Sequence, residues 1–143
     1  MALDVARLDI HSGNREEASA FLEKTWPEHN ARAGIDWVVE DHYITAHEGE
    51  RMVGAAHYRI VGGVGGLEEL VVVPDRMHEG IGSRLMVEFE TRCRAAGCHL
   101  LNLDTGDYQA RPFYEKHGWH VYATLSNHRF GHEWYLMEKP LAG

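Results

Sequence analysis

A strand, a turn and a glycine-flanked helix follow one another within residues 71–85, and this junction constrains the fold more than any other segment. Val71-Val72-Val73 is rich in β-branched residues and stops at Pro74, and Gly80-Ile81-Gly82-Ser83 opens a helical stretch. Unpaired N–H groups at a helix N-terminus bind anions, and glycine lets a ligand approach the backbone. Alone, the junction fits a phosphate site or a plain turn into a core helix, because it lacks a complete P-loop or dinucleotide motif.

Hydrophobic periodicity gives the order of the other elements. An opening run with Val5, Leu8 and Ile10 could be a strand, and Asn14 with Glu17 three residues on has the spacing of a capping box for a helix that Pro27 ends or kinks. We predict strands at 43–47, 52–60, 67–73, 99–104, 119–125 and 133–138, a turn at 62–66, and helices from residue 80 to Gly97 and over 108–117. This order predicts a mixed α/β (α+β) fold with a crossover helix.

Composition excludes several classes of protein. The 143 residues predict one domain over 1–143, and the formal net charge of −8 gives no basic surface for nucleic acid. An acidic surface suits a cationic substrate such as an amine, or serves solubility alone. Cys93 and Cys98 match no disulfide or metal pattern and are expected to be reduced. No secretory leader or long apolar run is present, so we expect a cytoplasmic protein without membrane contact.

Two linked motifs resemble the GNAT superfamily of acetyl-CoA-dependent N-acetyltransferases. Met77-His78-Glu79-Gly80-Ile81-Gly82 resembles the pyrophosphate loop Gln/Arg-x-x-Gly-x-Gly/Ala of that family, and residues 107–119 resemble its Asn-x-x-Ala-x-x-Phe-Tyr-x-x-x-Gly-Phe block. The resemblance is strong over residues 67–139 and rests on the order of elements over 1–66. It implies a mixed, mostly antiparallel sheet of about six to seven strands, helices on both faces, and a splayed central strand pair that holds acetyl-CoA.

The resemblance also implies which residues bind the cofactor. Backbone groups of Val71, Val72 and Val73 would pair with the pantetheine arm. The backbone N–H groups that would hold the pyrophosphate are those of His78, Glu79, Gly80, Ile81, Gly82 and Ser83, and the second motif adds Asp107, Ala110 and Tyr114. Met77 and His78 depart from the family pattern, Glu79 would repel a pyrophosphate unless Arg76 or Arg84 offsets it, and Asp107 replaces the frequent Asn.

Tyr114 matches the family tyrosine that donates a proton to the thiolate of coenzyme A, or it is a packed core aromatic. Glu68 matches a strand position from which relatives reach the acceptor amine, directly or through water. Glu69 would face the other side of a regular strand, but a bulge could exchange the two glutamates. The general base therefore stays open between Glu68, Glu69 and a water, and either glutamate could be a solvated strand-end residue.

The resemblance places the acceptor site near residues 26–37 and 126–132, and the candidates there are Trp26, His29, Trp37 and His128. Aromatic and acidic groups suit an amine with a ring or hydrocarbon body, although such loops also occur on surfaces. His42, His47 and His57 lie on predicted strands, where they would line the acceptor pocket or lie at the surface. The histidine pairs at 117 and 120 and at 128 and 132 lack a third ligand by sequence, so no metal is expected.

These observations lead to one main functional hypothesis. The chain is expected to move the acetyl group of acetyl-CoA directly to a primary amine of a small molecule or peptide in a ternary complex. A non-catalytic acyl-CoA-binding or sensing module on the same fold is the alternative, kept open by Met77 and Glu79. A nucleotide-phosphate-binding domain rests on the glycine loop alone. A homodimer is also expected, because the last strands are a frequent pairing surface in the family.

Overall fold

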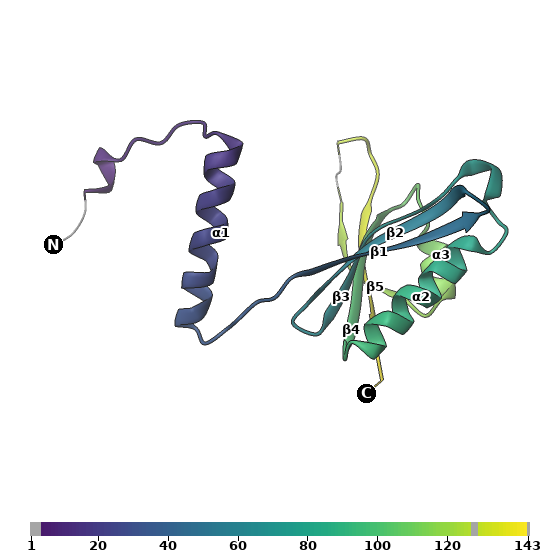
Figure 1. Cartoon of the computed structure of the whole chain (residues 1–143). Coiled ribbons are helices and arrows are strands. Elements are labelled where there is room, and N and C mark those ends of the chain that lie inside the picture. Colours follow the sequence, from purple (N-terminus) through teal and green to yellow (C-terminus); the bar gives the residue numbers. More distant parts are fainter. Residues whose placement is uncertain (1–3, 127–128, 143) are drawn as a thin grey trace. The chain divides into compact units, whose positions relative to one another are not determined.

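The computed structural model describes residues 4–126 and 129–142 of the chain. Contacts within the chain define two units, Met1–Trp37 and Val38–Gly143 (Figure 1). The single domain expected over residues 1–143 therefore stays a prediction. In the described residues, no helix is long and apolar enough to cross a membrane.

The first unit contains a short 3₁₀ helix, η1 (Val5–Arg7), and the helix α1 (Arg15–Arg32). Asn14 is the N-cap of α1, as predicted: its side-chain oxygen accepts hydrogen bonds from the backbone N–H groups of Glu16 at 2.9 Å and Glu17 at 3.2 Å. The helix continues through Pro27 to Arg32, so the prediction of an end at Pro27 is wrong. Proline removes one hydrogen bond, but its fixed φ is compatible with a helix.

The predicted opening strand is also wrong. Val5 belongs to η1, which begins at Asp4, whose carboxylate accepts a hydrogen bond from the N–H of Ala6 at 3.1 Å. Residues 8–10 form neither helix nor strand. A strand needs a partner for its backbone groups, and the described residues of this unit form no strand with which it could pair.

In the second unit, the described residues form one six-stranded sheet in the order β1-β2-β3-β4-β6-β5. Its strands are β1 (Glu40–Glu48), β2 (Arg51–Val61), β3 (Val64–Val72), β4 (Leu100–Gly106), β5 (His120–Leu125) and β6 (Trp134–Pro140). All neighbouring pairs are antiparallel except β3 and β4. The mostly antiparallel sheet is therefore confirmed, with six strands. The predicted turn at 62–66 is shorter than expected, because β3 already begins at Val64.

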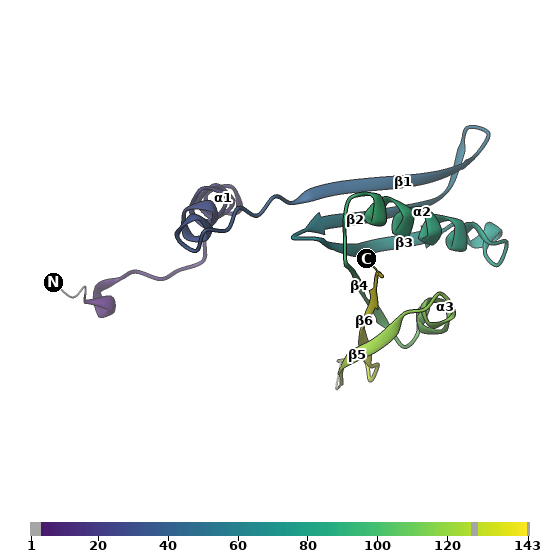
Figure 2. The ribbon, with the colours of Figure 1, turned by 90° about the horizontal axis from the view of Figure 1, so that it is seen from below.

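The one parallel pair of the sheet is short. Residues Val64, Gly65 and Gly66 of β3 pair with Leu100, Leu101 and Asn102 of β4, and the register ends there. Beyond this point β4, β6 and β5 turn away from β1, β2 and β3, as Figure 2 shows. The splayed central pair implied by the family resemblance is thus present. Gly65 lets the Cys93 side chain lie close to the backbone of β3, because a Cβ at this position would be 2.5 Å from Cys93 Sγ.

Helix α2 (Ile81–Ala95) covers one face of β1, β2 and β3. Its buried side chains are Leu85, Met86, Phe89 and Cys93, and the four-residue spacing of Leu85, Phe89 and Cys93 forms an apolar stripe along one face. The ring of Phe89 packs edge-on against Tyr58 of β2 at 5.2 Å. The short helix α3 (Arg111–Lys116) adjoins the start of α2, where Ser83 Oγ lies 3.2 Å from His117 Nε2. A helix on the opposite face of the sheet stays a prediction.

The two cysteines are free and buried in this core, as the sequence predicted for reduced structural thiols. Burial raises the pKa of Cys93 to about 12. Burial also raises the pKa of Cys98. Neither thiol lines the pocket described below, so both act as small apolar core residues.

Candidate functional site

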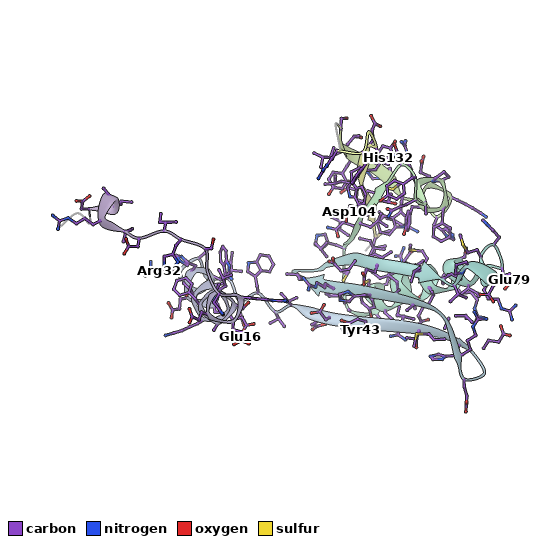
Figure 3. The ribbon with its side chains drawn as sticks, turned by 90° about the horizontal axis from the view of Figure 1, so that it is seen from above. Glu16, Arg32, Tyr43, Glu79, Asp104 and His132 are labelled. Carbon is purple, nitrogen blue, oxygen red and sulfur yellow. The ribbon has the colours of Figure 1, made fainter. Side chains whose placement is uncertain are left out.

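A pocket of about 570 Å³ lies where β3 and β4 separate. Its walls come from β1, β2 and β3 on one side and from β4, α3 and β6 on the other. Figure 3 labels one residue from each side, Tyr43 on β1 and Asp104 on β4. The polar and aromatic residues of the lining are Tyr43, His57, Glu68, Glu69, Asp104, Thr105, Gln109, Tyr114 and Trp134. The splay thus opens the sheet and brings together titratable groups from separate parts of the chain.

Glu68 and Glu69 both line the pocket. The register between β2 and β3 shifts at this point, because His57 pairs with Glu69 and Tyr58 pairs with Leu67, which leaves Glu68 as the extra residue. Such a bulge breaks the alternation of a regular strand, and both glutamates belong to the continuous run from Leu67 to Val71 that lines the pocket. The structure therefore contains the bulge that the sequence left open, with both glutamates beside the pocket.

Tyr114 reaches the pocket from the middle of α3 and is 8% exposed. Burial raises the pKa of its phenol, so the hydroxyl keeps its proton at neutral pH. The rings of Phe113 and Trp119 contact it edge-on at 5.2 Å and 6.0 Å between centroids. Tyr114 is thus packed in the core and also lines the pocket, so its position agrees with both interpretations from the sequence, a core aromatic and a residue of the site.

His57 belongs to a hydrogen-bonded cluster that the sequence did not reveal. Its Nε2 lies 2.7 Å from Asp41 Oδ1, and its Nδ1 lies 4.0 Å from Glu69 Oε2. The ring of Tyr43 stacks on the imidazole at 4.6 Å with an interplanar angle of 7°. Arg59 Nε donates to the same Asp41 oxygen at 2.9 Å. Of the three strand histidines, His57 lines the pocket, whereas His42 bonds to Glu40 and His47 to Thr45.

The opposite wall is held by polar contacts around the end of β4. Trp134 Nε1 donates to Asp104 Oδ2 at 2.6 Å. Gln109 Oε1 accepts from Thr105 Oγ1 at 3.1 Å and from the backbone N–H of Gly106 at 2.8 Å. These bonds connect β4, β6 and the segment before α3, so this wall has a defined shape.

The loop before α2 presents a row of unpaired backbone donors. From His78 to Ser83, the backbone N–H groups have no acceptor in the part of the chain that the structure describes. Gly80 is the N-cap at φ 88° without a side-chain cap, and His78 also has a positive φ of 66°. Donors at a helix N-terminus with left-handed residues beside them form a cradle for an anion. The loop therefore fits the pyrophosphate role implied by the resemblance.

Arg76 compensates the acidic residue in this loop. Its guanidinium lies 3.5 Å from the carboxylate of Glu79 and also pairs with Glu48. Figure 3 shows Glu79 at the end of the sheet where this loop lies. The Nε atom of Arg76 is buried without a hydrogen-bond partner among the described residues. The arginine thus neutralises part of the negative charge that the sequence placed next to the cradle.

The other cofactor candidates divide between two positions. Val71 and Ala110 line the pocket, whereas Val72 is the last residue of β3, whose edge toward β4 has no ladder partner beyond Gly66. Val73 follows the strand and donates its backbone N–H to Val53 O at 2.9 Å. Asp107 is bound to the start of β6: it accepts hydrogen bonds from the backbone N–H of Glu133 at 3.0 Å and from His132 at 2.7 Å. The hydrogen bond from the Glu133 backbone N–H, together with the hydrogen bond from His132, lowers the pKa of Asp107. Contact of Asp107 with the cofactor stays a prediction.

The predicted acceptor residues do not lie in the described lining. Trp26, His29 and Trp37 belong to the first unit, and their role stays a prediction. His128 lies outside the described residues. No group of three or more potential metal ligands occurs within residues 4–126 and 129–142. His117 and His120, which the sequence brought together, have separate partners, Ser83 and Glu138.

Comparison with known proteins identifies a family and a shared fold. Residues 12–119 match the model of the acetyltransferase (GNAT) family. An uncharacterized N-acetyltransferase, YjcF, of Bacillus subtilis (strain 168) is 36% identical over 84 residues, which are 57% of this chain and 58% of that protein.

Solved structures agree with this match. An acetyltransferase from Bacillus cereus ATCC 14579 superposes with a TM-score of 0.84 and 26% identity over 96% of this chain and 100% of that one. An aminoglycoside 6'-N-acetyltransferase complexed with coenzyme A gives a TM-score of 0.66 and 20% identity over 95% of this chain and 98% of that one.

Proposed function

Because this chain belongs to the GNAT acetyltransferase family, we propose that it moves the acetyl group of acetyl-CoA directly to a primary amine. One observation carries the proposal: the carboxylates of Glu68 and Glu69 and the protonated phenol of Tyr114 open on the same pocket at the strand splay. Amide formation from a thioester needs a proton acceptor for the amine and a proton donor for the thiolate. The pocket offers both kinds of group.

The chain's own backbone would hold acetyl-CoA, which supplies the acetyl thioester when bound. The unpaired N–H groups from His78 to Ser83 would take the pyrophosphate. Backbone groups of Val71 and Val72 at the free edge of β3, and of Val73 just after the strand, would pair with the pantetheine arm, and Ala110 lines the same pocket as Val71. An aminoglycoside acetyltransferase of the same fold is complexed with coenzyme A, which supports this assignment.

The two proton transfers of the reaction, to the thiolate and from the amine, involve opposite walls of the pocket. Tyr114 donates its phenolic proton to the departing thiolate, because burial keeps that proton in place at neutral pH. The proton acceptor belongs to the wall formed by β1, β2 and β3, which carries Glu68 and Glu69, the two candidates that the sequence offers beside a water. Direct transfer is favoured over a thioester on the protein, because both cysteines are buried and neither lines the pocket.

The lining also suggests the chemistry of the acceptor. Glu68, Glu69 and Asp104 give the pocket an acidic character, and Tyr43 and Trp134 supply aromatic faces. Carboxylates and aromatic faces both attract ammonium groups. We therefore propose a cationic amine with an apolar or ring body, either a small molecule or a peptide terminus.

Thermal unfolding with acetyl-CoA, and with ATP as the control, tests the cofactor site. Ligand at about 100 times Kd adds ~2.7 kcal/mol, which raises the Tm by roughly 5–10 °C for a domain of this size. A shift with ATP and not with acetyl-CoA would instead favour a nucleotide-binding domain.

Release of free thiol from acetyl-CoA tests the transfer. The amine panel would contain kanamycin, spermidine, tyramine, Nα-acetyl-lysine and a peptide that begins with alanine. Thiol release that depends on one of these amines is the expected result. A Tm shift with acetyl-CoA but no thiol release with any of them would favour the non-catalytic acyl-CoA-binding module.

A further inference from the structure

We infer that His57, oriented by Asp41, is the group that takes the proton from the acceptor amine. This inference rests on the proposed acetyl transfer and assigns its general base. His57 lines the pocket, is 17% exposed, and has a carboxylate on each side of its ring, Asp41 from β1 and Glu69 from β3. Two more titratable residues belong to this cluster in the described part of the chain: Tyr43 stacks on the ring, and Arg59 donates a hydrogen bond to Asp41.

The hydrogen bond to Asp41 determines the tautomer of the imidazole. Hydrogen bonds from His57 and Arg59 lower the pKa of Asp41, so this residue is a carboxylate at neutral pH and can only accept. The 2.7 Å contact therefore requires a proton on Nε2 of His57. In the neutral ring the lone pair is then on Nδ1, the nitrogen on the Glu69 side. Stacking by Tyr43 holds the ring in this plane.

The distance between His57 Nδ1 and Glu69 Oε2 leaves a place for an amine. The two atoms are 4.0 Å apart, too far for a direct hydrogen bond. This distance is less than twice a hydrogen-bond length of about 2.9 Å, so one ammonium nitrogen can reach both atoms at once. Glu69 would then attract the cation while His57 accepts the proton.

Geometry favours the imidazole over Glu69 as base. The His57 side chain is 17% exposed and is held by Asp41, whereas the Glu69 side chain is 80% exposed, so the imidazole offers the more fixed proton acceptor. One ammonium proton moves to His57 Nδ1, and the freed nitrogen lone pair forms a bond to the acetyl carbonyl carbon. The carbon–sulfur bond breaks, the thiolate takes the Tyr114 proton, the second amine proton restores Tyr114, and His57 returns its proton to water.

The activity test compares three variants with the amine of the panel that gives the fastest thiol release. His57→Gln keeps a side-chain amide that can donate to Asp41 but removes the base, and we expect kcat to fall about 100-fold or more at pH 7. The rate of this variant should rise about tenfold per pH unit at pH values below the pKa of the acceptor amine, because the free amine increases in that proportion there. Asp41→Asn should show a smaller loss of kcat.

His42→Gln is the matched control. His42 lies on β1, bonds to Glu40 at 3.1 Å and stacks on Tyr58, but it does not line the pocket. We expect its activity and pH profile to equal those of the wild type. A His57→Gln enzyme with less than a threefold loss and an unchanged pH profile would overturn the inference, whereas wild-type protein without thiol release would overturn the proposed function.

Nuclear magnetic resonance gives a readout that does not depend on turnover. Long-range ¹H–¹⁵N correlations of the ligand-free protein should show His57 protonated on Nε2 alone at pH 8. Asp41→Asn should change this tautomer, because an amide can donate to Nε2. A proton on Nδ1 in the wild type would overturn the inference even if His57→Gln failed to fold.

Discussion

Gly65 pairs with Leu101 just before β3 and β4 separate, and its replacement by alanine tests how closely side chains pack against the sheet at this point. An added Cβ would lie 2.5 Å from Cys93 Sγ and 2.9 Å from Leu101 Cδ2, both of them fully buried side chains. Overpacking of this kind costs about 1–3 kcal/mol. Gly66→Ala is the matched control, because its Cβ would meet first the end of the Asn102 side chain at 3.0 Å.

The two substitutions share one gain, the ~0.4–1 kcal/mol from a less flexible unfolded chain. Their difference therefore isolates the clash, and we expect Gly65→Ala to be less stable than Gly66→Ala by about 1–3 kcal/mol. At roughly 4 °C per kcal/mol for a chain of this size, calorimetry should show a Tm lower by about 4–12 °C.

A double-mutant cycle with Cys93→Ala locates the clash. Removal of the sulfur opens space for the new methyl group, so the double mutant should be more stable than the sum of the single changes by about 1 kcal/mol or more. Equal stability of Gly65→Ala and Gly66→Ala, together with additive effects of Gly65→Ala and Cys93→Ala, would refute the reasoning about this contact.

Three further predictions concern the site and its support. Tyr114→Phe should lower kcat about 10-fold or more and leave the KM for acetyl-CoA within about threefold, because the phenol acts on the leaving thiolate; an unchanged kcat in steady-state assays would exclude this role. Glu79→Gln should lower the KM for acetyl-CoA about 2–5-fold, because it removes a negative charge next to the cradle and leaves Arg76 with one carboxylate partner, Glu48, in place of two; a higher KM would contradict this. Burial alone would raise the pKa of Glu90, but its bonds to Lys139 and Arg94 lower it overall. That stabilisation is present above the unfolded pKa and is lost as the pH falls through the lower folded value. Urea unfolding should therefore show a stability advantage of the wild type over Glu90→Gln at pH 7 that shrinks by pH 3.5. A larger advantage at pH 3.5 than at pH 7 would contradict this prediction.

Local features were readable from the sequence because their causes are local. Asn14 caps α1 because its side chain reaches N–H groups two and three residues away. The cradle before α2 follows from a helix N-terminus with Gly80, and the stripe of α2 follows from the helical period. The same reasoning failed at Val5, since a strand exists only where a second strand supplies hydrogen bonds.

The base of the proposed reaction depends on pairings that no local rule provides. A two-residue turn at Gly49 and Glu50 sets the pairing of Glu48 with Arg51. A register shift between Ala46 and His47 then moves all pairs farther from the turn by one residue. That shift places Tyr43 beside His57, and the bulge at Glu68 lies where both glutamates line the pocket. Because side chains alternate along a strand, one residue of slip decides which of them face the pocket.

The sequence by itself therefore determined the order of elements from residue 43 onward, the glycine-flanked start of α2 and the choice of Glu68, Glu69 and Tyr114 as site candidates, since helix caps, periodicity and linked motifs lie within short stretches of chain. Only the tertiary structure decided that Asp41, His57 and Glu69 lie close together, and that β3 and β4 separate beyond Gly66. These contacts between residues of different strands result from register and strand order, which depend on the packing of the whole sheet on α2 rather than on any one segment.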